Sequence, residues 1–439
     1  MTSSKVVRSA VVLGTVGLAL AACSGNSASS GGSSSASAAP ASGNGTLIIG
    51  TLLPQTGSLA FLGPPEFAGV DLAIKEINAA GGVNGKPVDS VTGDSGDTST
   101  NIAAQTVDRE ISQGVDAIVG AASSSVTLSV IDKVTNAGVV MVSPANTSTK
   151  LTDYPDKGLY FRTAPPDTLQ GKVLADQALA DGKQNICIMA LQDAYGEGLA
   201  NVVDQVFTEA GGNVTDTIIY DPKAASFEAE VSKCKATNPD GIVLIGFDES
   251  KKILAEMIKQ NVGPQQVQLY LVDGNLSNTL AEGLPEGTMT GVKGTTPGAK
   301  PSDAFRAQLA TVNPNLTDFT YAAEAYDAVN LIALAAIFGK NDSGTAIAQN
   351  IAKVSGANNE GEVCSTFTAC LELLNAGKTI NYEGQSGPIN LDANGDPSRA
   401  AMGVYVFGPD NKYTLNNTVV ADVPASTGSS SGSASASAS

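Results

Sequence analysis

The sequence contains no histidine among its 439 residues. Histidine is the commonest general base in enzymes and the usual partner of serine and cysteine nucleophiles, so its absence excludes the ordinary catalytic pairs. It also leaves no zinc site of the usual type. No phosphate-binding loop ending in Gly-Lys-Ser/Thr occurs, and the segment Tyr195 to Gly198 lacks the third glycine of a dinucleotide-binding loop. We therefore expect a protein that is not an enzyme and that holds no metal and no cofactor.

Basic residues are also few, with 25 Lys and Arg against 43 Asp and Glu, which gives a net charge of −18. This balance argues against nucleic acid or an anionic membrane surface as a partner. The acidic residues are dispersed, as is typical of a solvated surface. Asp392 to Asp396 faintly resembles a calcium-binding loop, but its glycine is misplaced and Gly403 stands at position twelve. We expect a hairpin turn there.

No apolar run at the N-terminus is long enough to span a membrane as a helix. Lys5 and Arg8 precede the uncharged run 11–22, which ends at Cys23, and this order predicts a secretory signal peptide over residues 1–22. Residues 23–45 are rich in Ser, Gly and Ala and are expected to be a flexible tether. Residues 425–439 have the same composition and are expected to be a disordered tail.

The end of the signal peptide, Leu20-Ala21-Ala22-Cys23, resembles a bacterial lipobox. That resemblance implies that Cys23 is lipidated after cleavage. The mature protein would then be extracytoplasmic, anchored to the outer face of the cell membrane without spanning it. The alternative is a signal peptide followed by an incidental cysteine.

Five cysteines leave four once Cys23 is set aside, and an oxidising compartment permits disulfides. Cys364 and Cys370 lie close together in sequence and are expected to close one loop. Cys187 and Cys234 would then pair by elimination, although four cysteines allow three connectivities. A reduced, buried Cys187 remains the alternative.

The chain from residue 46 to about 422 alternates apolar strands with amphipathic helices, which predicts α/β architecture with mostly parallel sheets. About 375 ordered residues suggest two domains. The expected strands are 47–53, 88–92, 116–120, 185–191, 214–220, 241–245 and 268–272. The expected helices are 66–79, 101–113, 168–180, 198–210, 227–236 and 249–261.

The stretch from Asp116 to Thr147 carries the clearest indication of a ligand site. It reads as a buried strand, a helix that begins at Ser123 to Ser125, and a second strand that ends in small polar residues. A helix N-terminus offers unpaired amides and a partial positive charge. We therefore expect this end of the helix to attract a small carboxylate.

At this point an ordered series of motifs resembles a known family. The motifs are LIIGTLLPQTGSLAFLGPPEFAGVDLAIKEINAAGGVNGKPV, AIVGAASSS, VSPANTS, FRTAPPD, DAYGEGLA and AYDAVNLIALA. They are similar to the leucine/isoleucine/valine-binding proteins of bacterial ABC importers, over roughly residues 46 to 422. The resemblance implies a type I periplasmic-binding fold, in which two α/β lobes joined by three hinge crossovers hold a ligand between them.

The same resemblance implies the lobe boundaries. The crossovers would fall near 163–166, 294–297 and 383–388. Lobe 1 would then comprise residues 46–163 plus 297–384, and lobe 2 residues 164–296 plus 388–422.

The family's ligand positions carry over where the motifs match. Ser124 would bind the ligand carboxylate together with Thr147, and Ala145 would offer its carbonyl to the ligand ammonium. From lobe 2, Tyr195 and Phe247 would close over the ligand. Asp273 stands where the family has a glutamate that pairs with the ammonium, and Leu62 stands where relatives often carry an aromatic residue; both differences change the reach of the pocket.

Each of these residues also has a purely structural interpretation. Ser124 could be a helix cap, Thr147 and Asp273 could stabilise turns, and Tyr195 and Phe247 could be packed aromatic residues. Taken together, they predict a monomeric solute-binding lipoprotein that delivers an amino acid, branched-chain or related, to a membrane ABC permease. The alternatives are a ligand sensor for a membrane signalling partner, and an importer receptor for an amide, urea or an aromatic acid.

Overall fold

The computed structural model describes residues 43–425. The predictions for the signal peptide, for Cys23, for nearly all of the tether and for the C-terminal tail lie outside the described residues.

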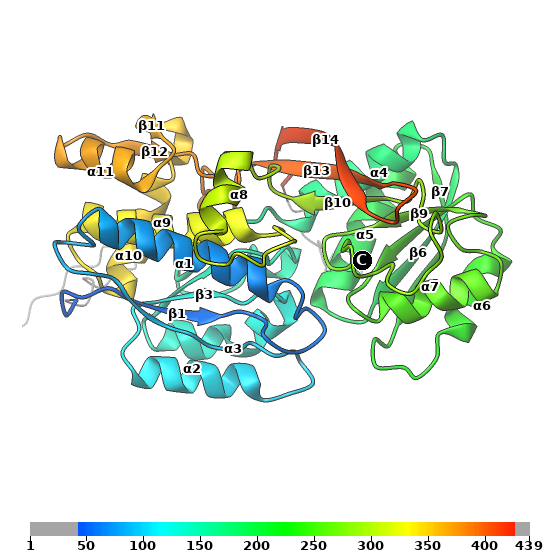
Figure 1. Ribbon diagram of the computed structural model, residues 1–439, viewed down its shortest axis with the longest axis horizontal. Helices are drawn as coiled ribbons and strands as arrows, with labels where there is room; N and C mark the ends of the chain where they lie inside the picture. Colours follow the sequence, from blue (N-terminus) through cyan, green and yellow to red (C-terminus); the bar gives the residue numbers. More distant parts are fainter. Residues whose placement is uncertain (1–42, 426–439) are drawn as a thin grey trace, which may run out of the picture. The chain divides into compact units, whose positions relative to one another are not determined.

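The first sheet has five parallel strands in the order β2-β1-β3-β4-β5. They are β1 (Ile48–Leu52), β2 (Asp89–Val91), β3 (Ala117–Gly120), β4 (Val140–Ser143) and β5 (Tyr160–Arg162). Helices α2 (Ile102–Ser112) and α3 (Ser124–Asn136) cover one face, and α1 (Gly63–Ala79), α9 (Ala322–Gly339) and α10 (Gly344–Val354) lie over the other (Figure 1). Because both faces are covered, β3 and β4 are buried along their whole length, as their apolar sequences predict.

Within residues 43–425, α9 is the one helix that is long and apolar enough to cross a membrane. It packs against α1 and α10, and 83% of its apolar window is buried inside the protein. The helix also carries Glu324, Asp327 and Asn330 among its buried residues. We therefore interpret α9 as the core helix of the lobe built on the first sheet.

The second sheet has seven strands in the order β14-β13-β10-β9-β8-β6-β7. They are β6 (Asn185–Leu191), β7 (Asn213–Tyr220), β8 (Gly241–Ile245), β9 (Gln268–Leu271), β10 (Lys293–Pro297), β13 (Arg399–Phe407) and β14 (Tyr413–Asp422). Its helices are α4 (Asp167–Ala180), α5 (Ala194–Glu209), α6 (Glu228–Ala236) and α7 (Ser250–Lys259). Strands β6 to β10 run parallel, and β13 pairs antiparallel with both β10 and β14.

The chain passes between the two sets of elements three times, after β5, after β10 and after β12 (Ile380–Tyr382). Between the second and third passages it forms α8 (Asp303–Leu309), α9, α10, β11 (Glu362–Cys364), α11 (Phe367–Asn375) and β12, which return to the first sheet. We call the elements on the first sheet lobe 1 and those on the second sheet lobe 2. The predicted α/β fold with mostly parallel sheets and three crossovers is confirmed; the small parallel pair β11–β12 was not predicted.

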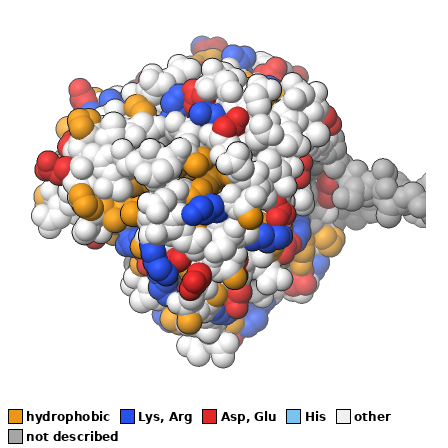
Figure 2. Space-filling view, turned by 90° about the vertical axis from the view of Figure 1, so that its right-hand side faces the viewer, with side chains coloured by type: hydrophobic (Ala, Val, Ile, Leu, Met, Phe, Trp, Pro, Cys, Tyr) orange, Lys and Arg blue, Asp and Glu red, His pale blue; other side chains and the backbone are white. Residues whose placement is uncertain are grey.

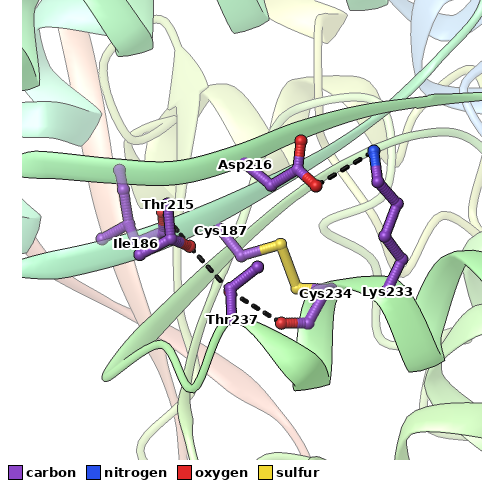
Figure 3. Close-up of a disulfide and its surroundings, with 7 residues drawn as sticks. All are labelled: Ile186, Cys187, Thr215, Asp216, Lys233, Cys234 and Thr237. Carbon is purple, nitrogen blue, oxygen red and sulfur yellow. Dashed lines mark hydrogen bonds and ion pairs between the residues drawn. A yellow bond between two sulfur atoms is a disulfide. The ribbon is translucent and has the colours of Figure 1, made fainter.

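Both expected disulfides are present. Cys187 in β6 is bonded to Cys234 in α6, with Cα atoms 5.9 Å apart (Figure 3). Cys364 in β11 is bonded to Cys370 in α11. The first bond joins residues 47 apart in sequence, and closing a loop of that length stabilises a fold by on the order of 4 kcal/mol in the chain-entropy account.

The acidic excess forms no patch of one sign on the face seen in Figure 2, where Lys and Arg side chains alternate with Asp and Glu side chains. The ion pairs of the described residues are mostly exposed, such as Lys133 with Asp108 at 2.8 Å. Such pairs contribute little to stability.

One helix begins earlier than its sequence predicts. Helix α5 starts at Ala194 instead of Gly198. The side chain of Asp193 caps it, accepting hydrogen bonds from the amides of Tyr195 at 3.0 Å and Gly196 at 2.7 Å. This cap places Tyr195 in the first helical turn, where the side chain is almost fully buried.

Candidate ligand-binding site

A small cavity of about 10 Å³ lies between residues of the two lobes. Its walls contain every residue for which a ligand role was predicted, namely Leu62, Ser124, Ala145, Thr147, Tyr195, Phe247 and Asp273. Leu59, Ala122, Ser123, Gly274 and Tyr321 complete the lining. The carboxyl ends of β3, β4, β8 and β9 thus face one shared space, as the strand order of open α/β sheets leads one to expect.

The N-terminus of α3 forms one wall of the cavity. Ser123 is the N-cap, because its hydroxyl accepts a hydrogen bond from the amide of Val126 at 3.4 Å. Ser124 is therefore free of the capping role, and its hydroxyl accepts a hydrogen bond from the amide of Ser148 at 3.2 Å. The first amides of an α-helix have no partner within the helix, so this wall presents donors and a partial positive charge to a ligand.

The loop after β4 carries Ala145 and Thr147, and buried hydrogen bonds hold it against β3. The side-chain amide of Asn146 donates to the carbonyls of Ala121 at 3.0 Å and Ala122 at 2.9 Å. Its side-chain oxygen accepts from the hydroxyl of Tyr160 at 3.0 Å. These contacts fix the loop from behind and leave Ala145 and Thr147 at the cavity.

A fully buried arginine supports the same loop from further behind. The guanidinium of Arg162 donates to the carbonyls of Ser148 at 2.9 Å and Asn146 at 3.3 Å. It also forms a two-point ion pair with Asp396, at 2.5 and 2.8 Å. The predicted turn at 392–396 is present, closed by a bridge between Leu391 and Pro397, and it supplies this carboxylate. Arg162 therefore links the ligand-side loop of lobe 1 to the third crossover.

The opposite wall is centred on Asp273, which follows β9. Each oxygen of its carboxylate accepts a hydrogen bond of 2.6 Å, one from the hydroxyl of Tyr195 and one from that of Tyr321. Burial raises the pKa of Asp273, and the two tyrosine hydroxyls act in the opposite direction. Tyr195 belongs to lobe 2, whereas Tyr321 immediately precedes α9 of lobe 1. The Tyr321 bond therefore joins the two lobes across the cavity.

Apolar side chains make up the rest of the wall. The rings of Tyr195 and Phe247 are stacked, with centroids 5.6 Å apart and planes 8° apart. Gly274 allows this arrangement, because a Cβ atom there would lie 2.9 Å from the ring of Phe247. Leu59 and Leu62 face them from lobe 1. The cavity therefore combines polar ends with an apolar middle.

Further hydrogen bonds between the lobes lie beside the cavity. The hydroxyl of Ser125 in α3 donates to Asp193 at 2.9 Å and accepts from the amide of Ala194 at 3.1 Å. The hydroxyl of Ser148 donates to the carbonyl of Ala194 at 2.7 Å. Together with the Tyr321 bond, these contacts show the two lobes in a closed arrangement.

A family model described as periplasmic binding protein matches residues 46–403. The chain belongs to the periplasmic binding protein family. The Leu/Ile/Val-binding protein homolog 2 of Brucella abortus is 28% identical over 379 residues, which cover 84% of this chain and 92% of that protein. The chemotactic signal transduction system substrate-binding protein BasB of Halobacterium salinarum is 26% identical over 366 residues, which cover 80% and 84% of the two chains.

The fold agrees with solved structures. The branched-chain amino acid transporter substrate-binding protein LivJ of Streptococcus pneumoniae, in complex with isoleucine, aligns with a TM-score of 0.70 at 23% identity. The alignment covers 86% of this chain and 99% of LivJ. As a member of the periplasmic binding protein family, this chain is an extracytoplasmic solute-binding protein and not an enzyme. No group of three metal-ligating side chains occurs in the part of the chain that the structure describes.

Two residues around Asp273 were not predicted from the sequence, namely Tyr321 and Asp167. Tyr321 reaches Asp273 from 48 residues away, and no local pattern marks it. Asp167 is fully buried and lies beside the hydroxyl of Thr147. Burial and then the neighbouring Asp273 raise the pKa of Asp167 well above its usual value. Asp167 ends the quoted motif FRTAPPD, so its place in that motif was the available signal.

Proposed function

We propose that this protein is a lipid-anchored receptor that binds an amino acid, branched-chain or closely related, between its lobes and delivers it to a membrane ABC permease. The observation that carries the proposal is the single cavity bounded by Ser124 and Thr147 on lobe 1 and by Asp273 on lobe 2. One end suits an anion and the other a cation, which is the charge pattern of a free amino acid.

In this proposal the ligand carboxylate lies at the first turn of α3, where helix amides and the partial positive charge stabilise an anion. The ligand ammonium lies toward Asp273 and the carbonyl of Ala145. Burying both charges costs desolvation, which only hydrogen-bonded partners offset. Each charged hydrogen bond contributes about 1.5 to 3 kcal/mol, so three or four support micromolar binding, about −8 kcal/mol.

The lining of the cavity favours an apolar ligand side chain. In this closed arrangement the cavity has a volume of only about 10 Å³, room for about one water molecule, so the lobes must move apart to admit an amino acid. Leu59, Leu62 and Phe247 offer apolar contacts to an aliphatic side chain. An apolar side chain therefore suits this wall better than a charged one.

A panel of ligands tests the proposal. A ligand that binds only the native state raises the melting temperature, so leucine, isoleucine, valine, threonine and alanine are compared with acetamide, urea and benzoate. We expect at least one aliphatic amino acid to raise the melting temperature. Acetamide and urea, which lack an ammonium group, should leave it unchanged. Stabilisation by acetamide, urea or benzoate alone, unaffected by Asp273→Ala, would replace the amino acid with that ligand class.

A sensory role is the second candidate, because the similar protein BasB belongs to a chemotactic signal transduction system. Deletion of the gene should have different effects in the two cases. Deleting the gene should abolish uptake of the radiolabelled ligand if the protein serves import. Unchanged uptake together with a lost behavioural or transcriptional response to the same ligand would favour sensing.

The anchor is tested separately at Cys23. Labelling with a radioactive fatty acid should mark the wild-type protein and leave Cys23→Ala unlabelled. The variant should also appear in the medium or the periplasmic fraction instead of the membrane fraction. A membrane-bound Cys23→Ala protein would refute lipid anchoring at this residue.

A further inference from the structure

A second and larger cavity, of about 270 Å³, lies beside the second crossover. It is bounded by the end of β10, by the segments before α8 and before α9, and by the hairpin β13–β14. Tyr321 lines both this cavity and the smaller one, and it is the only described residue that lines both. The second cavity therefore also lies between residues of both lobes. We call it the hinge cavity.

The hinge cavity contains a carboxylate with no partner from any other described residue. The side chain of Glu324, in the first turn of α9, lines the cavity and is only 3% exposed. Neither a side chain nor a main-chain amide of any other described residue donates a hydrogen bond to it. Gly298, with φ of +90°, lies against this carboxylate, where a Cβ atom would be 2.0 Å from Oε1. A buried, unpaired carboxylate is costly unless a positive charge or a donor meets it.

Glu66 of α1 makes the surroundings of Glu324 more acidic. Both of its carboxylate oxygens are enclosed and have no partner. Burial and then Glu324 raise the pKa of Glu66 well above its usual value. Glu324 therefore acts on Glu66, and neither carboxyl group has a basic partner among the described residues.

Aromatic rings form the remaining walls. Tyr405 of β13 and Tyr413 of β14 meet edge to face, with centroids 5.3 Å apart. Tyr321 and Phe319 line the cavity from the segment before α9. Faces of aromatic rings attract cations, and rings around a buried carboxylate are the pattern used for ammonium groups. Of the two basic residues at this cavity, Arg306 is paired with Asp303 and Lys300 is exposed, so neither satisfies Glu324.

We infer that the hinge cavity is a second binding site, which takes an organic cation whose ammonium group meets Glu324 between the rings of Tyr321, Tyr405 and Tyr413. Because residues of both lobes line this cavity, its occupant contacts the two lobes at once. Because Tyr321 also donates to Asp273 in the first cavity, the two sites share one side chain.

The protonation of Glu324 sets the pH dependence of this site. Burial raises the pKa of Glu324 to about 8. Burial also raises the pKa values of Tyr321, Tyr405 and Tyr413 above the ordinary tyrosine value, so these three side chains stay neutral near that pH. The charged or titratable groups that face Glu324 or line the cavity with it are Glu66, Lys300, Arg306, Asp318, Tyr321, Asp327, Tyr405 and Tyr413. A permanently charged ligand should therefore bind more tightly as the pH rises toward and past 8.

The test uses tetramethylammonium and choline, with 3,3-dimethylbutan-1-ol as the uncharged analogue of choline. Binding to the full-length protein is measured by calorimetry or ligand-observed NMR, with and without saturating leucine. Glu324→Gln removes the proposed charge, and Glu282→Gln makes the same chemical change at an exposed position outside both cavities. Tyr405→Leu removes one aromatic wall without changing the charge.

We expect the cations to bind the wild-type protein and Glu282→Gln equally, and the alcohol to bind at least about tenfold more weakly, the loss of one charged contact. Glu324→Gln should weaken cation binding about tenfold and remove its pH dependence, and Tyr405→Leu should weaken it by a smaller factor. Equal affinity for choline and its uncharged analogue, or unchanged binding in Glu324→Gln, would overturn the inference. Because the cations are measured also without leucine, a failure of leucine to bind would count against the proposed function alone.

Discussion

The hydrogen bond between Tyr321 and Asp273 makes a quantitative prediction about lobe closure. It is 2.6 Å long, fully buried and accepted by a carboxylate, and it joins the two lobes. Tyr195 donates an equally short bond to the other oxygen of the same carboxylate, but from within lobe 2. Opening the lobes would break the first bond and leave the second intact.

A hydrogen bond to a charged group is worth about 1.5 to 3 kcal/mol, and 1.4 kcal/mol corresponds to a factor of ten. Tyr321→Phe should shift the equilibrium between closed and open states by that amount. Because a ligand that binds the closed state must first populate it, the apparent dissociation constant should rise about 10-fold to 150-fold. Tyr195→Phe, which removes a bond present in both states, should have a smaller effect.

Calorimetry with the tightest ligand of the amino acid panel gives the affinities, and small-angle scattering gives the compactness of each variant. Tyr321→Phe should be more expanded than wild type at partial saturation and should become compact at saturating ligand. Equal losses of affinity in Tyr321→Phe and Tyr195→Phe, or identical scattering profiles of the wild-type protein with and without ligand, would refute closure through this bond.

Three further predictions concern single side chains. Asp273→Ala should weaken amino acid binding about tenfold or more through loss of one charged hydrogen bond; unchanged calorimetric affinity would remove its assigned role. Asp396→Asn should lower the free energy of unfolding, measured by urea denaturation, by about 3 to 5 kcal/mol, because it leaves Arg162 buried without its carboxylate partner. The control Asp303→Asn, at an exposed ion pair, should lower it by at most about 1 kcal/mol. Burial raises the pKa of Glu110 to about 8, so the melting temperature of the wild-type protein should fall as the pH rises from about 4.5 to 8. Glu110→Gln should make this fall shallower; the same pH profile in the variant would contradict the assignment to Glu110.

Local patterns were sufficient for the elements that hold the site. The apolar runs of β3 and β4 and the serines before α3 predicted a buried strand, a capped helix and a second strand, and the structure contains all three. These signals are short-range, since burial and capping depend on residues a few positions apart. The structure assigns the cap to Ser123 and so leaves Ser124 beside the cavity.

Long-range partners could not be predicted in the same way. Arg162 and Asp396 are 234 positions apart, and Tyr321 is 48 positions from Asp273. Tyr321 also has a left-handed backbone, with φ of 63°, which is rare for a tyrosine and is set by its tertiary surroundings. Glu324 lies on the mostly apolar helix α9, together with Asp327 and Asn330, and no local pattern marked its carboxylate as part of a cavity. The sequence therefore indicated where the site lies but not which distant residues complete it.

The most direct measurement of the central claim is a crystal structure of the protein with the tightest amino acid from the ligand panel. The account predicts the ligand in the cavity between the lobes, with its carboxylate at the first turn of α3 near Ser124 and Thr147 and its ammonium group toward Asp273. A ligand bound outside this cavity, or one whose carboxylate points toward Asp273, would contradict it.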